Sequence, residues 1–66
     1  MPLQETKLYK LWFSILDKES GVEISRRVGV FCGINLTDAQ RDAVEDCEDF
    51  DDASQVIVFD KDFIEF

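Results

Sequence analysis

Apolar side chains occur at every second position of Lys7–Leu16 (KLYKLWFSIL), the first strongly patterned stretch of the chain, but they also occur at helical spacing. As a strand, this stretch would turn four apolar side chains to one face, namely Tyr9, Leu11, Phe13 and Ile15. As a helix, it would carry an equally good apolar stripe, made of Leu8, Leu11, Trp12, Ile15 and Leu16. We favour the strand, because the stretch is rich in aromatic residues and runs into Asp17–Gly21, a polar segment suited to a hairpin loop that ends on a glycine at positive φ.

A second strand is expected over Val22–Cys32 (VEISRRVGVFC), with an apolar face made of Val22, Ile24, Val28 and Val30. Pairing Asp17 with Val22 across a four-residue loop sets three apolar pairs opposite each other: Ile15 with Ile24, Leu11 with Val28, and Tyr9 with Val30. Both apolar faces then lie on the same side, which supports the hairpin. Arg26 interrupts the pattern and predicts either a bulge near Arg26–Arg27 or a break in the strand.

A helical pattern follows the connector at residues 33–36. Thr37 and Gln40 have the spacing of a capping box, and Asp38 is favourable near the positive end of a helix. We expect a helix from Asp38 to about Asp49. Its inward side would consist of Ala43, Val44, Cys47 and Phe50.

The last part of the chain predicts a return to strand structure. Ser54–Phe59 (SQVIVF) is typical of a buried strand, either central in the sheet or next to the hairpin. Asp60–Asp62 is expected to form a turn, and Phe63–Phe66 a short final strand or tail. The predicted fold is therefore α+β: a small antiparallel-rich sheet in β-β-α-β order, possibly with a short fourth strand, and one helix packed on one face. We expect residues 1–66 to form a single small domain.

One helix covers only one face of such a sheet, so the other face should be open to solvent. On this open side the hairpin prediction places four large apolar residues, Leu8, Trp12, Leu16 and Phe31. A contiguous apolar patch on a protein surface usually marks a contact with a second copy or another partner. We therefore expect a dimer or partner patch there.

Composition sets limits on the class of protein. The chain of 66 residues is 45% hydrophobic, which is enough to form a core despite its small size. Met1–Glu5 lacks the basic start and the following apolar run of a signal peptide. No stretch reaches the roughly 18 apolar residues that a membrane span needs. We expect a cytoplasmic protein, in its own cell or in a host cell. Cys32 and Cys47 should be small buried hydrophobes, with a single disulfide as the alternative.

The charge is concentrated in one half of the chain. Residues 1–33 carry five basic and four acidic side chains, whereas residues 34–66 carry two basic and eleven acidic ones. The first half therefore has a net charge of +1 and the second half −9. The negative electrostatic field of the second half disfavours direct binding to the phosphate backbone of a nucleic acid.

The acids are densest in Asp42–Asp52, which we call the acidic segment. Seven carboxylates lie there: Asp42, Glu45, Asp46, Glu48, Asp49, Asp51 and Asp52. Near the C-terminal end of a helix, acidic side chains oppose the helix dipole and reduce stability. A sequence that departs from a local folding rule in this way indicates a surface kept for function.

Catalytic and metal-binding chemistry is not indicated. Histidine is absent, and the two cysteines do not form a zinc-binding or C-x-x-C pattern. The acidic segment does not fit an EF-hand, because Phe50 and Ala53 fall on ligand positions. We therefore expect no enzyme activity, no cofactor and no metal.

Charge and size favour a binding protein over other functions. We expect the seven acids to imitate a phosphate backbone and to contact a basic surface of a DNA- or RNA-binding enzyme, inhibiting or modulating it. In layout and charge the chain is similar to small phage-encoded inhibitors of polymerases, restriction enzymes or CRISPR enzymes, and to acidic immunity proteins. The alternative is a homodimeric structural or assembly protein that uses the Trp12 face, with acids that serve only solubility.

Overall fold

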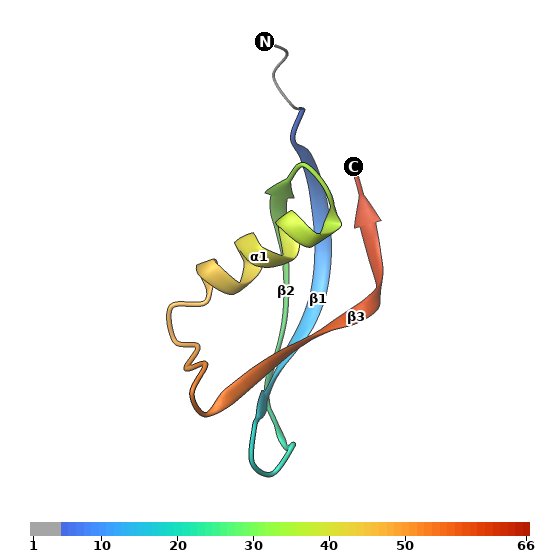
Figure 1. Ribbon diagram of the computed structural model, residues 1–66. Helices are drawn as coiled ribbons and strands as arrows, with labels where there is room; N and C mark the ends of the chain where they lie inside the picture. The colour runs from blue at the N-terminus through green and yellow to red at the C-terminus, as the bar shows by residue number, and fades with distance from the viewer. Residues whose placement is uncertain (1–4) are drawn as a thin grey trace.

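The computed structural model describes residues 5–66 and shows one sheet with one helix on one of its faces (Figure 1). In chain order the elements are β1 (Lys7–Asp17), β2 (Glu23–Gly33), α1 (Leu36–Asp46) and β3 (Gln55–Glu65). The strands are antiparallel in the order β2-β1-β3, so β1 is central. This confirms the α+β class and shows that Lys7–Leu16 is a strand. The expectation that Met1–Glu5 does not begin a signal peptide concerns mainly residues 1–4, which lie outside the described residues 5–66.

The predicted turn and fourth strand at the C-terminal end are wrong for the described residues. β3 is one strand at the edge of the sheet, and it runs through Asp60–Asp62. The irregularity sits in its pairing with β1: Leu11 is opposite Phe63, but Phe13 is opposite Phe59. The extra residues of β3 are absorbed as a bulge, and Figure 1 shows the strand bending midway along its length.

The hairpin between β1 and β2 begins in the predicted register. The Asp17 amide donates a hydrogen bond to the Val22 carbonyl (2.8 Å), and Gly21 has φ 75°. Leu16 is opposite Glu23, but Ile15 is opposite Ser25. Ile24 is therefore an extra residue in β2, and the bulge comes before Arg26–Arg27 rather than at that pair.

This bulge reverses the predicted faces of β2. Beyond it, Tyr9 is opposite Phe31 and Leu11 is opposite Gly29, so the predicted partners Val30 and Val28 are wrong by one residue. A shift of one residue exchanges the two faces of a strand. Val28 and Val30 consequently lie on the face away from α1, where 55% and 52% of their surface is exposed.

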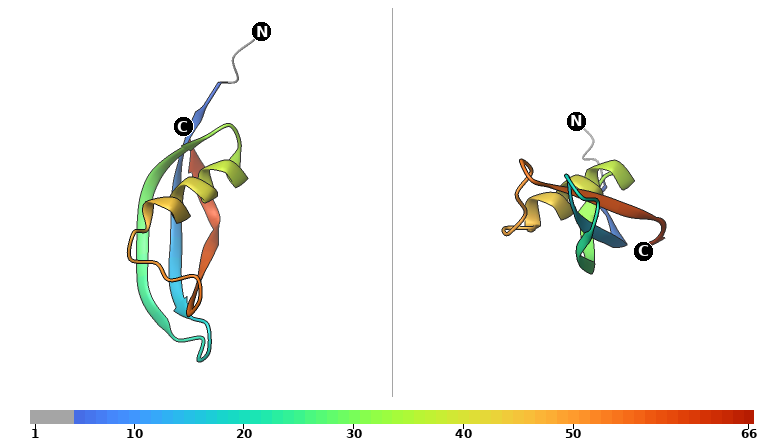
Figure 2. Two further views of the ribbon diagram at one scale, coloured as in Figure 1. Left: turned by 60° about the vertical axis from the view of Figure 1, so that its left-hand side comes forward. Right: turned by 90° about the horizontal axis from the view of Figure 1, so that it is seen from below.

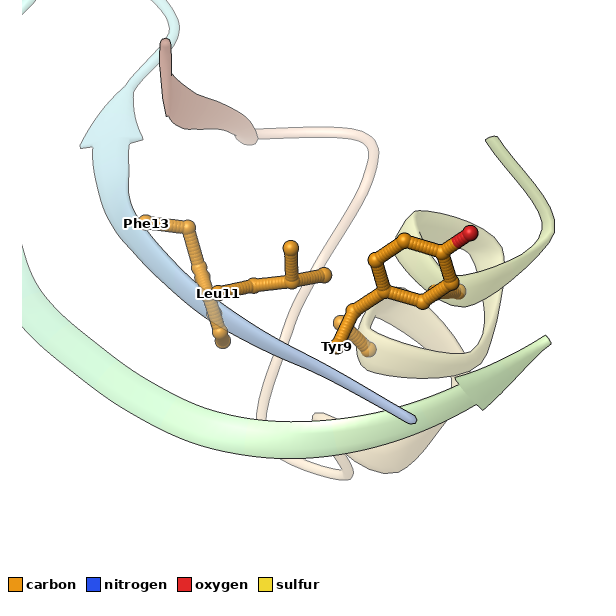
Figure 3. Packing of buried hydrophobic residues seen from close by; sticks show 5 residues of the cluster. Tyr9, Leu11 and Phe13 are labelled. Carbon is orange, nitrogen blue, oxygen red and sulfur yellow. The ribbon is translucent and has the colours of Figure 1, made fainter. Parts of the chain in front are cut away.

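The core lies between β1 and α1 (Figure 3). Its buried residues are Tyr9, Leu11, Phe13, Ala39 and Ala43. The Phe13 ring lies 5.3 Å from the Phe59 ring and 6.1 Å from the Phe31 ring, measured between centroids. The core is thus built mainly from the odd-numbered residues of β1, as the alternation in Lys7–Leu16 predicts.

Small residues allow α1 to approach the end of β2 closely. A methyl group added at Gly33 would lie 2.5 Å from the backbone nitrogen of Ala39, which leaves no room for a side chain. Ala39 and Ala43 are the fully buried positions of the helix. The views in Figure 2 show α1 crossing the sheet at an angle near β2, with the opposite face of the sheet left uncovered.

The helix begins and ends earlier than predicted. Asn35 is the N-cap, because its side-chain oxygen accepts a hydrogen bond from the Asp38 amide (2.8 Å). Thr37 is therefore inside the first turn, and the proposed capping box is wrong. The helix ends at Asp46 with Cys47 as its C-cap, three residues short of Asp49.

Cys47 is only half-buried, Cys32 is exposed, and both thiols are free, so the expectation of two buried cysteines is wrong. Within residues 5–66 no helix combines the length and apolar character that crossing a membrane requires.

Candidate partner-binding surfaces

The acidic segment spans the end of α1 and the loop that follows it. All seven of its carboxylate side chains are exposed. Asp42, Glu45 and Asp46 lie on the helix, whereas the other four acids lie in the loop at residues 47–54. Fewer of the acids lie on the helix than expected, because the helix stops at Asp46 and not at about Asp49. What the fold retains is a continuous exposed stretch of acids that leads from the helix to β3.

Asp49 is bound within the fold by an arginine of β2. The Arg27 guanidinium donates one hydrogen bond to Asp49 Oδ1 (2.9 Å) and a second to Oδ2. Hydrogen bonds from Arg27 lower the pKa of Asp49, and the same contact raises the pKa of Arg27. Asp49 is thus ionised and already paired, which makes its role structural.

Asp51 organises the loop before β3. Its two carboxylate oxygens accept hydrogen bonds from the Ala53 amide (3.1 Å) and the Ser54 hydroxyl (2.8 Å). Its carbonyl accepts from the Gln55 amide (2.8 Å), and Gln55 Oε1 in turn accepts from the Asp51 amide (3.0 Å). These bonds give the loop a defined conformation.

The loop is also attached to the hairpin. Lys18 Nζ donates to the Asp52 carbonyl (2.7 Å), and the Lys18 amide donates to the Ser54 carbonyl (2.9 Å). Further up the segment, Asp42 Oδ2 accepts from the Cys32 amide (3.3 Å) at the outer edge of β2. Three of the seven acids, Asp42, Asp49 and Asp51, therefore use their side chains within the fold.

The remaining four acids are available to a partner. We call Glu45, Asp46, Glu48 and Asp52 the free acidic group, since none of them forms an ion pair among residues 5–66. Arg41, one turn before Glu45, is the cation nearest to them in sequence. The C-terminal end of α1 adds its partial negative charge at the same place, and its last turn contains no basic residue.

The second candidate surface is the side of the sheet turned away from α1, which we call the open face. Residue pairing across β1 identifies its apolar members: Leu8, Trp12, Leu16, Val28, Val30, Val56, Val58 and Ile64. Of the four residues predicted for this patch, Leu8, Trp12 and Leu16 lie there. Phe31 does not, because the bulge at Ile24 turns it toward the core, where it packs beside Phe13.

The charged residues of the open face form two groups. In the half near the hairpin, Arg26 pairs with Asp60 across β1 (2.8 Å), and Glu23 accepts a hydrogen bond from Ser14 (2.7 Å). In the half near the chain ends, Lys10 lies with its ammonium 5.3 Å from the centre of the Trp12 ring.

A shallow depression lies where β1 begins and β3 ends. Its lining consists of Glu5, Thr6, Lys7, Leu8, Glu65 and Phe66. Glu65 accepts a hydrogen bond from the Tyr9 hydroxyl (3.2 Å) and pairs with Lys7 (3.0 Å). Burial of the phenol, followed by the Glu65 charge, raises the pKa of Tyr9, whereas the bond from Lys7 lowers the pKa of Glu65.

The described residues offer no group of three or more metal-ligating side chains placed around one point.

Comparison with protein-family models, curated proteins and solved structures found no match to this chain. The sequence of β2 contains a signal for its true faces, because the small residues Ser25, Gly29 and Gly33 recur every four positions and lie on the helix side of the sheet.

Proposed function

We propose that this chain is a small, non-catalytic acidic protein that binds a basic surface of a DNA- or RNA-handling protein and inhibits or modulates it. One observation carries the proposal. Seven exposed acids lie within Asp42–Asp52, and only Asp49 is neutralised by an ion pair within residues 5–66. In size and charge the chain is similar to the phage-encoded inhibitors and acidic immunity proteins named above.

Electrostatics explains how such a surface would act. The free acidic group and the negative end of α1 create a field of one sign, which attracts a groove lined with lysine and arginine. Those same basic residues would otherwise bind phosphates, so the protein and the nucleic acid compete for one site. Association should be fast and should weaken as salt is added.

The ordered loop favours this role. Asp51, Gln55 and Lys18 fix the loop conformation through hydrogen bonds, so little conformational freedom is lost when a partner binds. The proposed partner is a protein rather than a nucleic acid or a membrane. The proposed place of action is the cytoplasm of the protein's own cell or of a host cell, and no cofactor or metal takes part.

The test compares two variants that lose the same number of negative charges. The first carries Glu45→Gln, Asp46→Asn and Glu48→Gln, and the matched control carries Glu5→Gln, Glu19→Gln and Asp62→Asn, three exposed acids outside the segment. Each protein is immobilised and used to capture partners from a cell lysate at low salt, followed by mass spectrometry. We expect the wild type and the control to capture a nucleic-acid-binding protein that duplex DNA releases.

Two outcomes would contradict the proposal. One is a captured protein that duplex DNA does not displace. The other is equal capture by both variants, which would show that the acids serve only solubility. In that case the second candidate function, a homodimeric structural or assembly protein, is favoured by the apolar open face.

A further inference from the structure

We propose that the open face is the interface of a homodimer, in which a second copy of this chain packs sheet against sheet. The two-fold axis crosses β1 beside Trp12, so the β1 strands of the two copies run in opposite directions. This inference concerns the face opposite α1 and does not depend on the function proposed for the acids. It rests on the size of the apolar surface and on the arrangement of charge.

The apolar surface is large for so small a chain. Val28, Val30 and Val58 are 55%, 52% and 48% exposed, and Leu8 is 49% exposed. Together with the other apolar side chains of the open face they present on the order of 500 Å² of apolar surface, at the upper end of what monomers usually leave uncovered. A standard interface takes about 800 Å² from each partner, so the open face with its polar rim has the size that a dimer needs.

The distribution of charge selects a second copy as the occupant. The whole chain has a net charge of −8, so two copies repel each other over most of their surfaces. The open face is different, because Lys10 and Arg26 balance Glu23 and Asp60 there. The excess acids lie elsewhere, many of them around α1 on the opposite side of the sheet. Two copies can therefore approach through this face without bringing their acidic segments together.

The charges within the open face fix the orientation. The half near the hairpin contains Glu23, Arg26 and Asp60 and carries one net negative charge, whereas the other half contains the positive Lys10. An axis across β1 at Trp12 places Lys10 of each copy over Ser14 of its partner, beside Glu23. An axis parallel to the strands would instead place Lys10 of one copy over Lys10 of its partner. The antiparallel arrangement is therefore the self-complementary one.

Trp12 lies at the centre of this arrangement. It is the only tryptophan in the chain, and it pairs with Val28 of β2 in the middle of the sheet. The axis brings the two Trp12 rings together, and it brings Val28 of each copy against Val28 of its partner. Tryptophan emission therefore reports directly on formation of the dimer.

The first experiment measures association of the purified protein by sedimentation velocity and by Trp12 emission, from low micromolar to several hundred micromolar concentration. We expect a concentration-dependent dimer whose formation shifts the emission to shorter wavelength. Val28→Glu should weaken the dimer by roughly 100-fold or more, because the buried charge is present in both copies. Val22→Glu is the control, since Val22 is 62% exposed but lies at the hairpin, outside the open face.

Circular dichroism establishes that both variants are folded, as expected for substitutions at exposed positions. A wild type that is monomeric throughout the range would overturn the proposal and leave the face to a different partner. Equal weakening by Val28→Glu and Val22→Glu would overturn it as well, since the loss would then reflect added charge alone.

The second experiment tests the orientation. Lys10→Glu should weaken the dimer because it places an acid beside Glu23 of the partner, and Glu23→Lys should weaken it because it places a cation beside Lys10. Combining Lys10→Glu with Glu23→Lys should recover most of the affinity lost in either single variant. A double variant weaker than both single variants would overturn the antiparallel arrangement.

Discussion

Arg27 and Asp49 join β2 to the loop after α1 through two parallel hydrogen bonds, although they are 22 positions apart in the sequence. The pair holds the loop after α1 against β2. Within the acidic segment Asp49 is therefore paired with a cation of the fold, whereas the free acidic group has no ion pair among residues 5–66. The charge of the segment is thus partly structural and partly available.

The stability that this pair contributes should depend on pH. Because Arg27 lowers the pKa of Asp49 in the folded state, the contribution is present above the ordinary aspartate pKa of about 3.9 and is lost as the pH falls through the lowered value. Asp49→Asn should therefore be less stable than the wild type at neutral pH. Urea unfolding across an acid series should show this difference shrinking below about pH 4.

Asp46→Asn is the control for that experiment. Asp46 is exposed at the end of α1 and has no ion pair among residues 5–66, so its removal should leave stability unchanged or raise it slightly. Equal losses of stability for the two variants would show that net charge, and not the Arg27 contact, is responsible.

Tyr9 should ionise at higher pH than a free tyrosine. Burial of its phenol is the main cause, and the Glu65 charge adds to it. Because Tyr9 is the only tyrosine, the ultraviolet absorbance of its phenolate gives the titration directly. Glu65→Gln should lower the apparent pKa of Tyr9 while leaving it above about 10, since burial remains. An unchanged titration in Glu65→Gln would contradict the contact between the two side chains.

The same shift predicts an effect of alkali on folding. The folded state holds the Tyr9 proton more tightly than the unfolded state, so this contribution is complete below about pH 10 and is lost as the pH rises through the raised value.

The start of α1 can be tested with two neighbouring substitutions. Asn35→Ala removes the side chain that caps the helix and should lower the free energy of unfolding by about 1 kcal/mol. Thr37→Ala should have little effect, because Thr37 is exposed within the first turn and does not cap it. Urea unfolding monitored by circular dichroism gives both values. A larger loss for Thr37→Ala would place the cap where the sequence pattern alone suggests it.

Close packing of α1 on β2 makes a similar pair of predictions. Gly33→Ala should destabilise the protein by about 1–3 kcal/mol, because its methyl group would meet the backbone of Ala39 and Asp38. Gly29→Ala should cost less, since its methyl group would meet only the ring of Phe31, which can move. Thermal unfolding of the two variants should rank them in this order, and the reverse order would contradict the close approach at Gly33.

The central strand could be predicted from sequence, although a helical stripe fits Lys7–Leu16 equally well, because its aromatic residues and the turn that follows favour a strand. Tyr9, Leu11, Phe13 and Ile15 alternate without interruption, and Asp17–Gly21 ends the strand with suitable turn residues. β2 was harder, because the break at Arg26 indicated a bulge nearby, but Ile24 continues the apolar alternation from Val22 and so concealed where the bulge lies. β3 was divided wrongly because Asp60–Asp62 has the composition of a turn, although the fold absorbs it within a strand.

The candidate surfaces show a similar division. The position of the acids was evident from sequence, but their separate roles were not, since Asp49 depends on Arg27 and Asp42 on the Cys32 amide. Such partners come from other elements and follow only from the tertiary fold. The residues of β1 in the apolar patch were placed on the correct side, because the faces of β1 follow from its predicted strand pattern. The prediction was wrong for Phe31 of β2, which packs beside Phe13 on the other side of the sheet.

The bulge at Ile24 has a consequence for how this chain can vary. Without one residue between Gly21 and Ser25, the pairing of β1 with β2 would remain in a single register along its whole length. Residues 25–33 would keep their partners on β1, so Arg27 would still lie on the side of Asp49 and Phe31 would still lie beside Phe13. The pairing of Leu16 with Glu23 would also be unchanged. In this short stretch the strand can therefore lose one residue without exchanging its two sides.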